Sequence, residues 1–155
     1  MSIWTQSVTI EQLNSPHLKT MVTNLGIDFV EVGEEHITAR MPVDERTIQP
    51  FGLLHGGASV ALAETLGSVA ASLTIDLSKQ MPVGMEINAN HLRPVSSGWV
   101  LGVVKPVHLG STTQVWETRI TNQDGKLVCI SRLTMAILNR PVRSNELKSN
   151  PFNPA

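Results

Sequence analysis

Cysteine, net charge and long apolar runs are all scarce in this sequence. Its 155 residues include one cysteine, Cys129, which excludes an internal disulfide and a metal cluster built from several cysteines. The formal net charge is −1, so we expect neither nucleic acid nor an anionic membrane surface as the main partner. The best candidate for a membrane span, 65–75, is shorter than the roughly 18 apolar residues that cross a bilayer.

The first 15 residues lack the basic start and apolar centre of a secretory signal. We therefore expect a cytoplasmic protein without a membrane anchor, which agrees with its low cysteine content. The length and the 41% hydrophobic composition suit a single globular domain, which we expect over 1–138. Residues 139–155 are rich in Pro and Asn and poor in apolar residues, so we expect a mobile C-terminal tail.

Short patterns before residue 43 predict two short helices and a hairpin. Residues 9–12 form a capping box, and Ser15-Pro16 has the N-cap and first-turn proline of a second helix that runs to Leu25. Residues 27–32 and 36–41 alternate as two strands around a Gly-Glu-Glu turn.

One long helix and four strands are expected after residue 55. Leu62 and Leu66 belong to an apolar stripe in the helix, which should run to Leu73. Pro106 implies a bulge or an edge position in the second of the four strands. The strands are expected at 81–91, 99–109, 113–121 and 126–138, with Val83, Met85, Ile87, Ala89 and His91 on one face. Strands in an unbroken run predict an α+β fold, in which an antiparallel sheet packs on the helix.

A polar loop leads into the long helix and carries the candidate chemistry. Residues 49–57 deliver a histidine and two glycines to the helix start, where backbone N–H groups are unpaired and the helix dipole is positive. Gly56 is a candidate oxyanion donor, and a plain glycine-rich turn is the structural alternative. Glu64, a lone acid in a helix of Ala, Leu, Ser and Gly, is a candidate base or nucleophile. An interface ion pair is its structural alternative.

Four further side chains are candidates for the same site. Ser68 follows Glu64 by four residues and can hold the attacking water. His55 can support the loop or polarise a carbonyl, and the Gln49 amide can donate to a thioester oxygen. His91 ends an apolar strand face, where a hydrogen-bonded core histidine and a contact to an aryl hydroxyl are both open.

Residues 49–59 with Glu64, followed by Gly-Met-Glu-Ile-Asn-Ala-Asn-His at 84–91, resemble the hotdog-fold acyl-CoA thioesterases. Within them, the match is to the bacterial group that includes 1,4-dihydroxy-2-naphthoyl-CoA hydrolase and the enterobactin-pathway proofreading thioesterase. The resemblance spans roughly residues 8–138. It implies a curved sheet around one central helix, two subunits that share a continuous sheet, and a homodimer or a dimer of dimers, that is, a homotetramer.

The resemblance also implies an active site at the dimer interface, without a metal or a bound cofactor. One subunit would supply Gln49, His55 and Gly56, and the other would supply Glu64 and Ser68. The nucleotide end of coenzyme A would lie near Gly110 and Ser111. Helix geometry agrees with a shared site, because eight residues of straight helix separate Gly56 from Glu64 by ~12 Å along the axis.

The expected function is hydrolysis of acyl-CoA thioesters, with an aromatic acyl group such as 1,4-dihydroxy-2-naphthoyl or hydroxybenzoyl preferred. Menaquinone biosynthesis is one setting that the resemblance suggests, and an acyl-carrier thioester remains open as the substrate. A hotdog hydratase or dehydratase is one alternative, although the loop at 49–57 fits thioesterases better. A non-catalytic acyl-CoA binding module is the other, but a binder has no need of an isolated carboxylate at Glu64.

Overall fold

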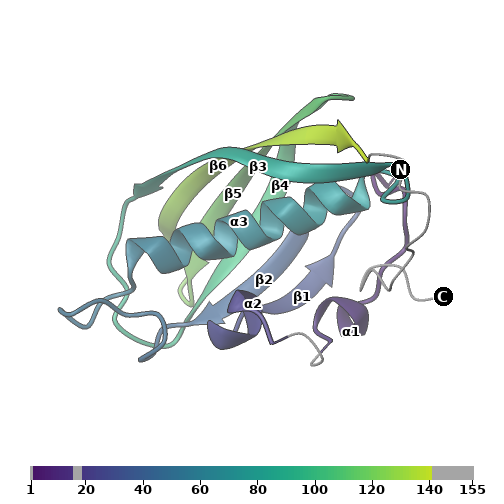
Figure 1. Cartoon of the computed structure of the whole chain (residues 1–155). Helices are drawn as coiled ribbons and strands as arrows, with labels where there is room; N and C mark the ends of the chain where they lie inside the picture. Colours follow the sequence, from purple (N-terminus) through teal and green to yellow (C-terminus); the bar gives the residue numbers. More distant parts are fainter. Residues whose placement is uncertain (1, 16–18, 141–155) are drawn as a thin grey trace.

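The computed structural model describes residues 2–15 and 19–140, which form one antiparallel sheet around one long helix (Figure 1). The long helix is α3 (Gly56–Leu73), and two short helices, α1 (Ile10–Leu13) and α2 (Met21–Asn24), precede the sheet in the chain. The strands are β1 (Asp28–Val32), β2 (Ile37–Pro42), β3 (Gln80–His91), β4 (Trp99–Leu109), β5 (Thr113–Asn122) and β6 (Leu127–Asn139).

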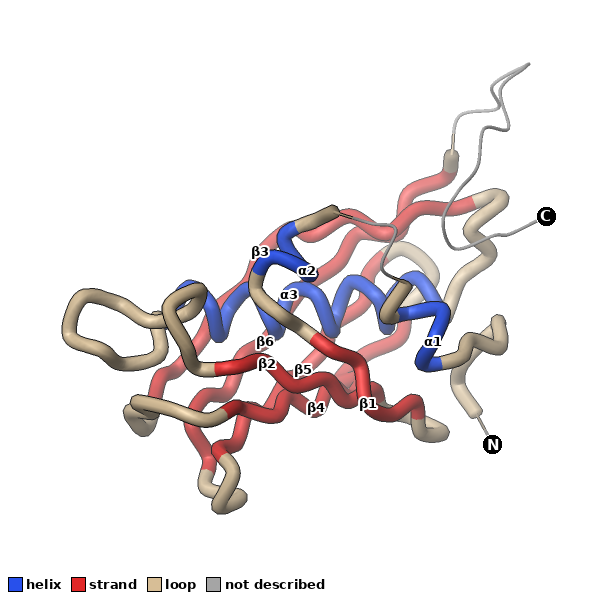
Figure 2. The backbone as a smooth tube through the Cα atoms, turned by 90° about the horizontal axis from the view of Figure 1, so that it is seen from below, coloured by secondary structure: helices blue, strands red, loops and turns tan. Residues whose placement is uncertain are grey.

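The six strands pair in the order β1-β2-β4-β5-β6-β3, and every neighbouring pair is antiparallel. Strand β3 follows α3 in the chain and lies at the edge of the sheet, beside β6. The sheet curves so that β3 and the β1–β2 hairpin flank α3 on opposite sides (Figures 1 and 2). The expected α+β fold, a curved antiparallel sheet around one central helix, is confirmed. Within the described ranges, no helix is long and apolar enough to cross a membrane.

Helix α3 lies close to the sheet because small residues face it. The side chains of Leu62 and Leu66 are fully buried, as their spacing predicts. A Cβ atom on Gly102 of β4 would lie 2.7 Å from Cδ1 of Leu66, and one on Gly67 would lie 2.5 Å from Cδ2 of Leu133 on β6. Larger side chains at these two glycines would force Leu66 and Leu133 out of their present packing.

A buried polar chain fixes the C-terminal end of α3 against β5. The indole N–H of Trp116 donates to Oε1 of Gln114 at 3.0 Å, and Nε2 of Gln114 donates to the hydroxyl of Thr74, the C-cap residue of α3, at 2.9 Å. Trp116 is fully buried and stacks on Trp4, with ring centroids 6.3 Å apart. The helix is therefore held in one axial position, which determines where its first turn lies.

The two short helices agree only in part with the sequence patterns. The capping box of α1 is present, because Thr9 caps Gln12 and is capped by it. The start predicted for the second helix is wrong, since α2 begins at Met21 with Thr20 as its N-cap residue. Part of that start signal, 16–18, lies outside the described residues, as do 141–155 of the predicted tail.

Strand β3 contains a bulge that the alternation pattern misses. Its pairing with β6 matches Gly84 with Met135 and Glu86 with Thr134, so Met85 is an extra residue without an opposite partner. After the bulge, Ile87, Ala89 and His91 face α3, as predicted. Before it, Gly84 faces α3, so the prediction that Val83 shares this face is wrong. The bulge predicted at Pro106 is confirmed, because the β4–β5 register shifts between Pro106 and His108.

Candidate functional site

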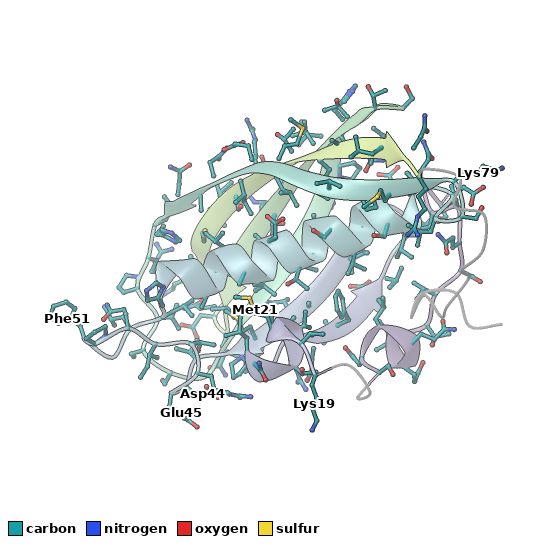
Figure 3. All side chains as sticks on the ribbon, viewed as in Figure 1. Lys19, Met21, Asp44, Glu45, Phe51 and Lys79 are labelled. Atoms are coloured by element: carbon teal, nitrogen blue, oxygen red, sulfur yellow. The ribbon has the colours of Figure 1, made fainter. Side chains whose placement is uncertain are left out.

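Local hydrogen bonds hold the loop that leads into α3. The N–H of His55 donates to the Thr47 carbonyl at 2.8 Å, and the buried Thr47 hydroxyl donates to the Pro42 carbonyl at 2.7 Å. Residues 49–53 form a tight turn at the tip, where Phe51 is 89% exposed and points away from the sheet (Figure 3). The base of the loop is therefore tied to the preceding residues by hydrogen bonds, and its tip is exposed.

His55 is the N-cap residue of α3. Its Nδ1 accepts a hydrogen bond from the N–H of Gly57 at 2.8 Å, so this ring nitrogen carries no proton and the imidazole is an acceptor towards the helix. The His55 carbonyl accepts from the N–H groups of Ala58 and Ser59. His55 thus caps the helix that follows the loop, whereas its imidazole does not line the cavity described below.

Gly56 retains a free N–H group at the helix start. The capping contacts use the N–H groups of residues 57–59, and that of Gly56 has no hydrogen-bond partner among the described residues. A free N–H at a helix N-terminus attracts negative charge, because it adds a donor to the positive end of the helix dipole. This is the property that an oxyanion donor requires.

A cavity of about 360 Å³ opens at the same helix start. His91, at the end of β3, packs so closely on Gly56 that a Cβ atom on this glycine would lie 2.8 Å from Nε2 of His91. The cavity brings together three predicted residues, Gln49, Gly56 and His91. Ser59, Leu53, Leu54, Leu92, Arg93, Pro94 and Val128 also line it. The site thus has a mainly apolar wall and a few polar groups, as ligand sites usually do.

The Gln49 side chain is oriented by the loop. Its Oε1 accepts a hydrogen bond from the N–H of Phe51, so the amide NH₂ group points the other way. In the part of the chain that the structure describes, this NH₂ group has no partner. It is available as a donor to a molecule in the cavity, as the sequence suggests.

Glu64 lies half-buried on the face of α3 that meets β3. Its Oε1 would lie 2.6 Å from a Cβ atom on Gly84, so a larger residue at that position of β3 would displace the carboxylate from its present place. Within the described ranges, Glu64 has no hydrogen-bond or ion-pair partner. Burial raises its pKa above the usual range, because a carboxylate loses hydration when it leaves water.

The remaining predicted residues lie on the Glu64 side of the molecule. Ser68 is half-buried one helical turn after Glu64. Gly110 and Ser111 form the β4–β5 turn, and the N–H of Gly110 donates to the Thr113 carbonyl at 2.9 Å. Ala136 of β6 pairs with Thr113 of β5 on one side and with Val83 of β3, the neighbour of Gly84, on the other. The turn is therefore at the end of the sheet opposite His91.

A single subunit thus carries two separate sets of groups. One set, Gly56 with Gln49 and His91, surrounds the cavity, and the other is Glu64 with Ser68. Helix α3 is continuous between Gly56 and Glu64, so the two groups stay ~12 Å apart along its axis. No single carbonyl can contact both groups within one chain.

Ser59 and Arg93 line the cavity but were not among the predicted site residues. Ser59 follows Gly56 by three residues, and this spacing places it on the same side of the helix, so periodicity was an available signal. Arg93 had no comparable signal, because it lies in the turn after β3, where its guanidinium donates to the Leu127 carbonyl.

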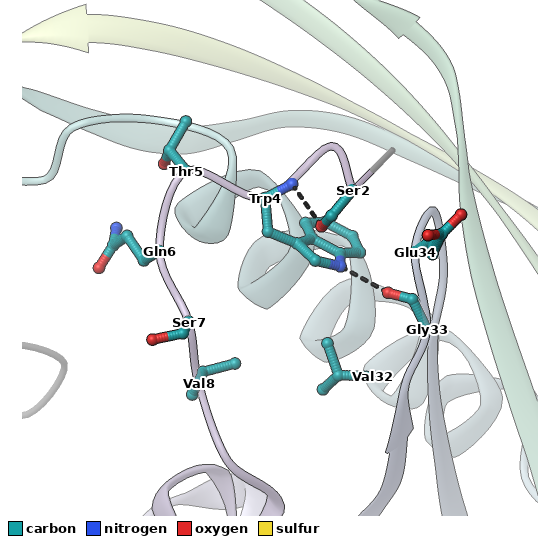
Figure 4. Close-up of a pocket in the computed structure, with 9 residues that line it drawn as sticks. All are labelled: Ser2, Trp4, Thr5, Gln6, Ser7, Val8, Val32, Gly33 and Glu34. Carbon is teal, nitrogen blue, oxygen red and sulfur yellow. Dashed lines mark hydrogen bonds between the residues drawn. The ribbon is translucent and has the colours of Figure 1, made fainter.

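A second cavity, of about 530 Å³, lies near the other end of α3 (Figure 4). It surrounds Trp4, whose indole N–H donates to the Gly33 carbonyl at 2.7 Å. The neighbouring N–H of Thr5 donates to the carbonyl of Leu73, the last residue of α3. This cavity contains none of the predicted site residues. Nowhere in the described ranges do three His, Cys, Asp or Glu side chains converge as a metal site would require.

Comparisons with known sequences identify a family. A model of the thioesterase superfamily matches residues 51–129. The 1,4-dihydroxy-2-naphthoyl-CoA hydrolase of Escherichia coli K12 is 54% identical over 136 residues, which cover 88% of this chain and 99% of that protein. The proofreading thioesterase EntH of Cronobacter sakazakii is 53% identical over 136 residues, which cover 88% of this chain and 98% of that protein.

Solved structures show the same fold. A crystal structure of a mutant of thioesterase PA1618 from Pseudomonas aeruginosa superposes with a TM-score of 0.88 at 52% identity, covering 90% of this chain and all of that one. Thioesterase HI1161 from Haemophilus influenzae superposes with a TM-score of 0.85 at 50% identity, covering 88% of this chain and 95% of that one.

The raised pKa of Glu64 predicts that this residue destabilises the fold at neutral pH. A folded-state pKa above the unfolded value means that the ionised form is disfavoured by folding, and this cost is absent below the unfolded pKa of about 4.5. Glu64→Gln should therefore raise the melting temperature at pH 7, and the gain should vanish below about pH 4. Thermal unfolding across this range tests it, with Glu45→Gln in the exposed loop as control. A gain independent of pH would contradict the assignment.

Proposed function

The chain belongs to the thioesterase superfamily and is a thioester hydrolase, and we propose that its substrates are aromatic acyl-CoA thioesters. The observation that carries this proposal is the free N–H of Gly56 at the start of α3, above a cavity with an apolar wall. Two relatives that are more than half identical are named for thioester chemistry, one of them for a naphthoyl-CoA substrate. A cavity of about 360 Å³ has room for an aryl group.

In the proposed reaction, the thioester oxygen accepts from the Gly56 N–H and from the Gln49 amide. Negative charge on this oxygen grows as the carbonyl carbon becomes tetrahedral, so donors at this place stabilise the transition state more than the substrate. His55 keeps the donor in place by capping the helix. The C–S bond then breaks, and the coenzyme A thiolate leaves and takes up a proton.

Glu64 supplies the attack on the carbonyl carbon. As a base, it removes a proton from a water molecule whose oxygen bonds to the carbon; as a nucleophile, it forms an anhydride that water then hydrolyses. A carboxylate without an ion-pair partner and with a raised pKa suits proton abstraction near neutral pH. Ser68, one turn further on, would hold the attacking water.

A homodimer would unite the two sets of groups, and strand β3 offers the edge for it. Among residues 2–15 and 19–140, no strand pairs with its outer side, and it exposes apolar side chains such as Met85, which is 68% exposed. An apolar, unpaired edge strand favours pairing with another strand. We infer that β3 pairs with β3 of a second subunit and continues the sheet.

The bulge determines which residues would face one another in this pairing. Because Met85 is skipped in the ladder, Gly84 lies three ladder positions before Asn88 and His91 lies three positions after it. A two-fold axis at Asn88 would therefore place Gly84 opposite His91 of the partner subunit. Since Glu64 lies on Gly84, and His91 lies on Gly56, this register brings Glu64 towards the other subunit's oxyanion donor. Two such dimers can form the homotetramer that the resemblance suggests.

The main test is thiol release from aryl-CoA thioesters. The wild-type enzyme should release free coenzyme A from hydroxybenzoyl- and dihydroxynaphthoyl-CoA. Glu64→Ala should lower kcat by about 100-fold or more without changing the oligomer, while Glu45→Ala should retain activity. Near-normal turnover by Glu64→Ala would refute the role of this carboxylate. Hydration of an acyl-CoA double bond without thiol release would favour a hydratase, and tight binding without turnover would favour a binding module.

The donor role of Gly56 can be tested with a matched pair of variants. Gly56→Pro removes the N–H group at the first position of α3, where proline is well tolerated, and His55 already has the extended backbone that precedes proline. Gly56→Ala adds a Cβ atom against His91 but keeps the N–H group. We expect kcat of Gly56→Pro to fall about 100- to 1000-fold below that of Gly56→Ala. Equal kcat values would show that the backbone donor is not used.

A further inference from the structure

Ser59 has a buried hydroxyl group without a protein partner. The residue is 2% exposed and lines the cavity at the start of α3. Buried Thr47 and Gln114 each make side-chain hydrogen bonds, whereas the Ser59 hydroxyl has no partner among the described residues. Every fully enclosed side-chain nitrogen or oxygen in residues 2–15 and 19–140 does have a partner. The Ser59 oxygen must therefore be reachable from the cavity.

The position of Ser59 relative to Gly56 decides what it can contact. Side chains of an α-helix lean towards its N-terminus, so Ser59 covers the turn that Gly56 begins. Its Cα lies about 4.5 Å further along the helix axis, whereas the free N–H of Gly56 points out of the helix start. A thioester oxygen bound to Gly56 would thus leave Ser59 facing a more distant atom of the acyl group.

An unpaired hydroxyl in a mainly apolar cavity disfavours a purely apolar occupant. Water can satisfy the Ser59 hydroxyl when the cavity is empty. An unsubstituted aryl ring that displaces this water from the cavity would leave the hydroxyl unpaired, which is unfavourable. A ring that brings its own hydroxyl restores the hydrogen bond.

We propose that Ser59 is a specificity-determining residue that hydrogen-bonds a ring hydroxyl of the aryl acyl group. This inference rests on the proposed function and adds to it the group by which the site distinguishes hydroxylated from unsubstituted aryl thioesters. A serine hydroxyl can both donate and accept, so it can pair with a phenolic hydroxyl in either sense.

The test compares four substrates in matched variants. Values of kcat/KM are measured for benzoyl-CoA and for 2-, 3- and 4-hydroxybenzoyl-CoA. The wild-type enzyme should prefer at least one hydroxylated substrate over benzoyl-CoA. Ser59→Ala should lower that preference about 10-fold, because activity on the hydroxylated substrate falls while activity on benzoyl-CoA stays the same or rises. Ser59→Cys, of similar size but a weak donor, should behave like Ser59→Ala. Ser72→Ala, further along the same helix, should keep the wild-type preference.

Five results would overturn the inference. A parallel loss on benzoyl-CoA would mean that Ser59 acts on the thioester or on the fold. An unchanged preference in Ser59→Ala, or a wild-type preference retained by Ser59→Cys, would remove the hydrogen bond as the cause. A wild-type enzyme that cleaves all four substrates equally would refute the role of Ser59 but leave the proposed function standing. If the enzyme released thiol from none of the four substrates, both the role of Ser59 and the proposed function would be refuted.

Discussion

A continuous α-helix holds the free N–H of Gly56 and the carboxylate of Glu64 ~12 Å apart, and the other features of the site follow from this separation. Each group contacts a residue of β3: Gly56 packs against His91, and the carboxylate of Glu64 packs against Gly84. Since β3 is the edge strand, both contacts lie at the boundary of the subunit. The helix thus separates the groups, and both of them lie beside the edge strand that the proposed dimer would use.

Several groups in the site lower the stability of the folded single chain. A half-buried carboxylate without a partner is disfavoured by folding, and so are unpaired donors near a cavity. The glycines at the helix start also lose more conformational freedom on folding than other residues would. The buried contacts of Leu62, Leu66 and Trp116 with the sheet offset these costs at a distance from the chemistry. Proteins often compensate for destabilising functional groups by stabilising contacts elsewhere in the fold.

Much of the fold could be predicted from the sequence because its local signals agree with its packing. The glycine-rich start of α3, its Leu62–Leu66 stripe and the bulge at Pro106 all belong to this class. The bulge at Met85 could not be predicted, because alternation continues through it and only pairing with β6 reveals the extra residue. The predicted start of α2 was wrong because Ser15-Pro16 carries a stronger capping signal than Thr20, the residue that caps the helix in the structure.

The candidate site was predictable in its residues more than in its geometry. Gln49, Gly56 and His91 line one cavity. Their spacing in the sequence does not predict that His91 lies next to the start of α3. That contact depends on the edge position of β3, which follows from the order of the strands. The resemblance to a known family implies an active site shared between two subunits. The local contacts of Gly84 and His91 supply a register in which it can form.

Reassortment of two inactive subunits tests the shared site most directly. Gly56→Pro and Glu64→Ala lie on different halves of the proposed site, so a mixed dimer would contain one site with both changes and one intact site. Random pairing of the two co-expressed chains should restore about one quarter of the wild-type activity, since about half of the dimers are mixed. If each subunit formed its own site, the co-expressed mixture would be no more active than the two parent variants, and the account would be wrong.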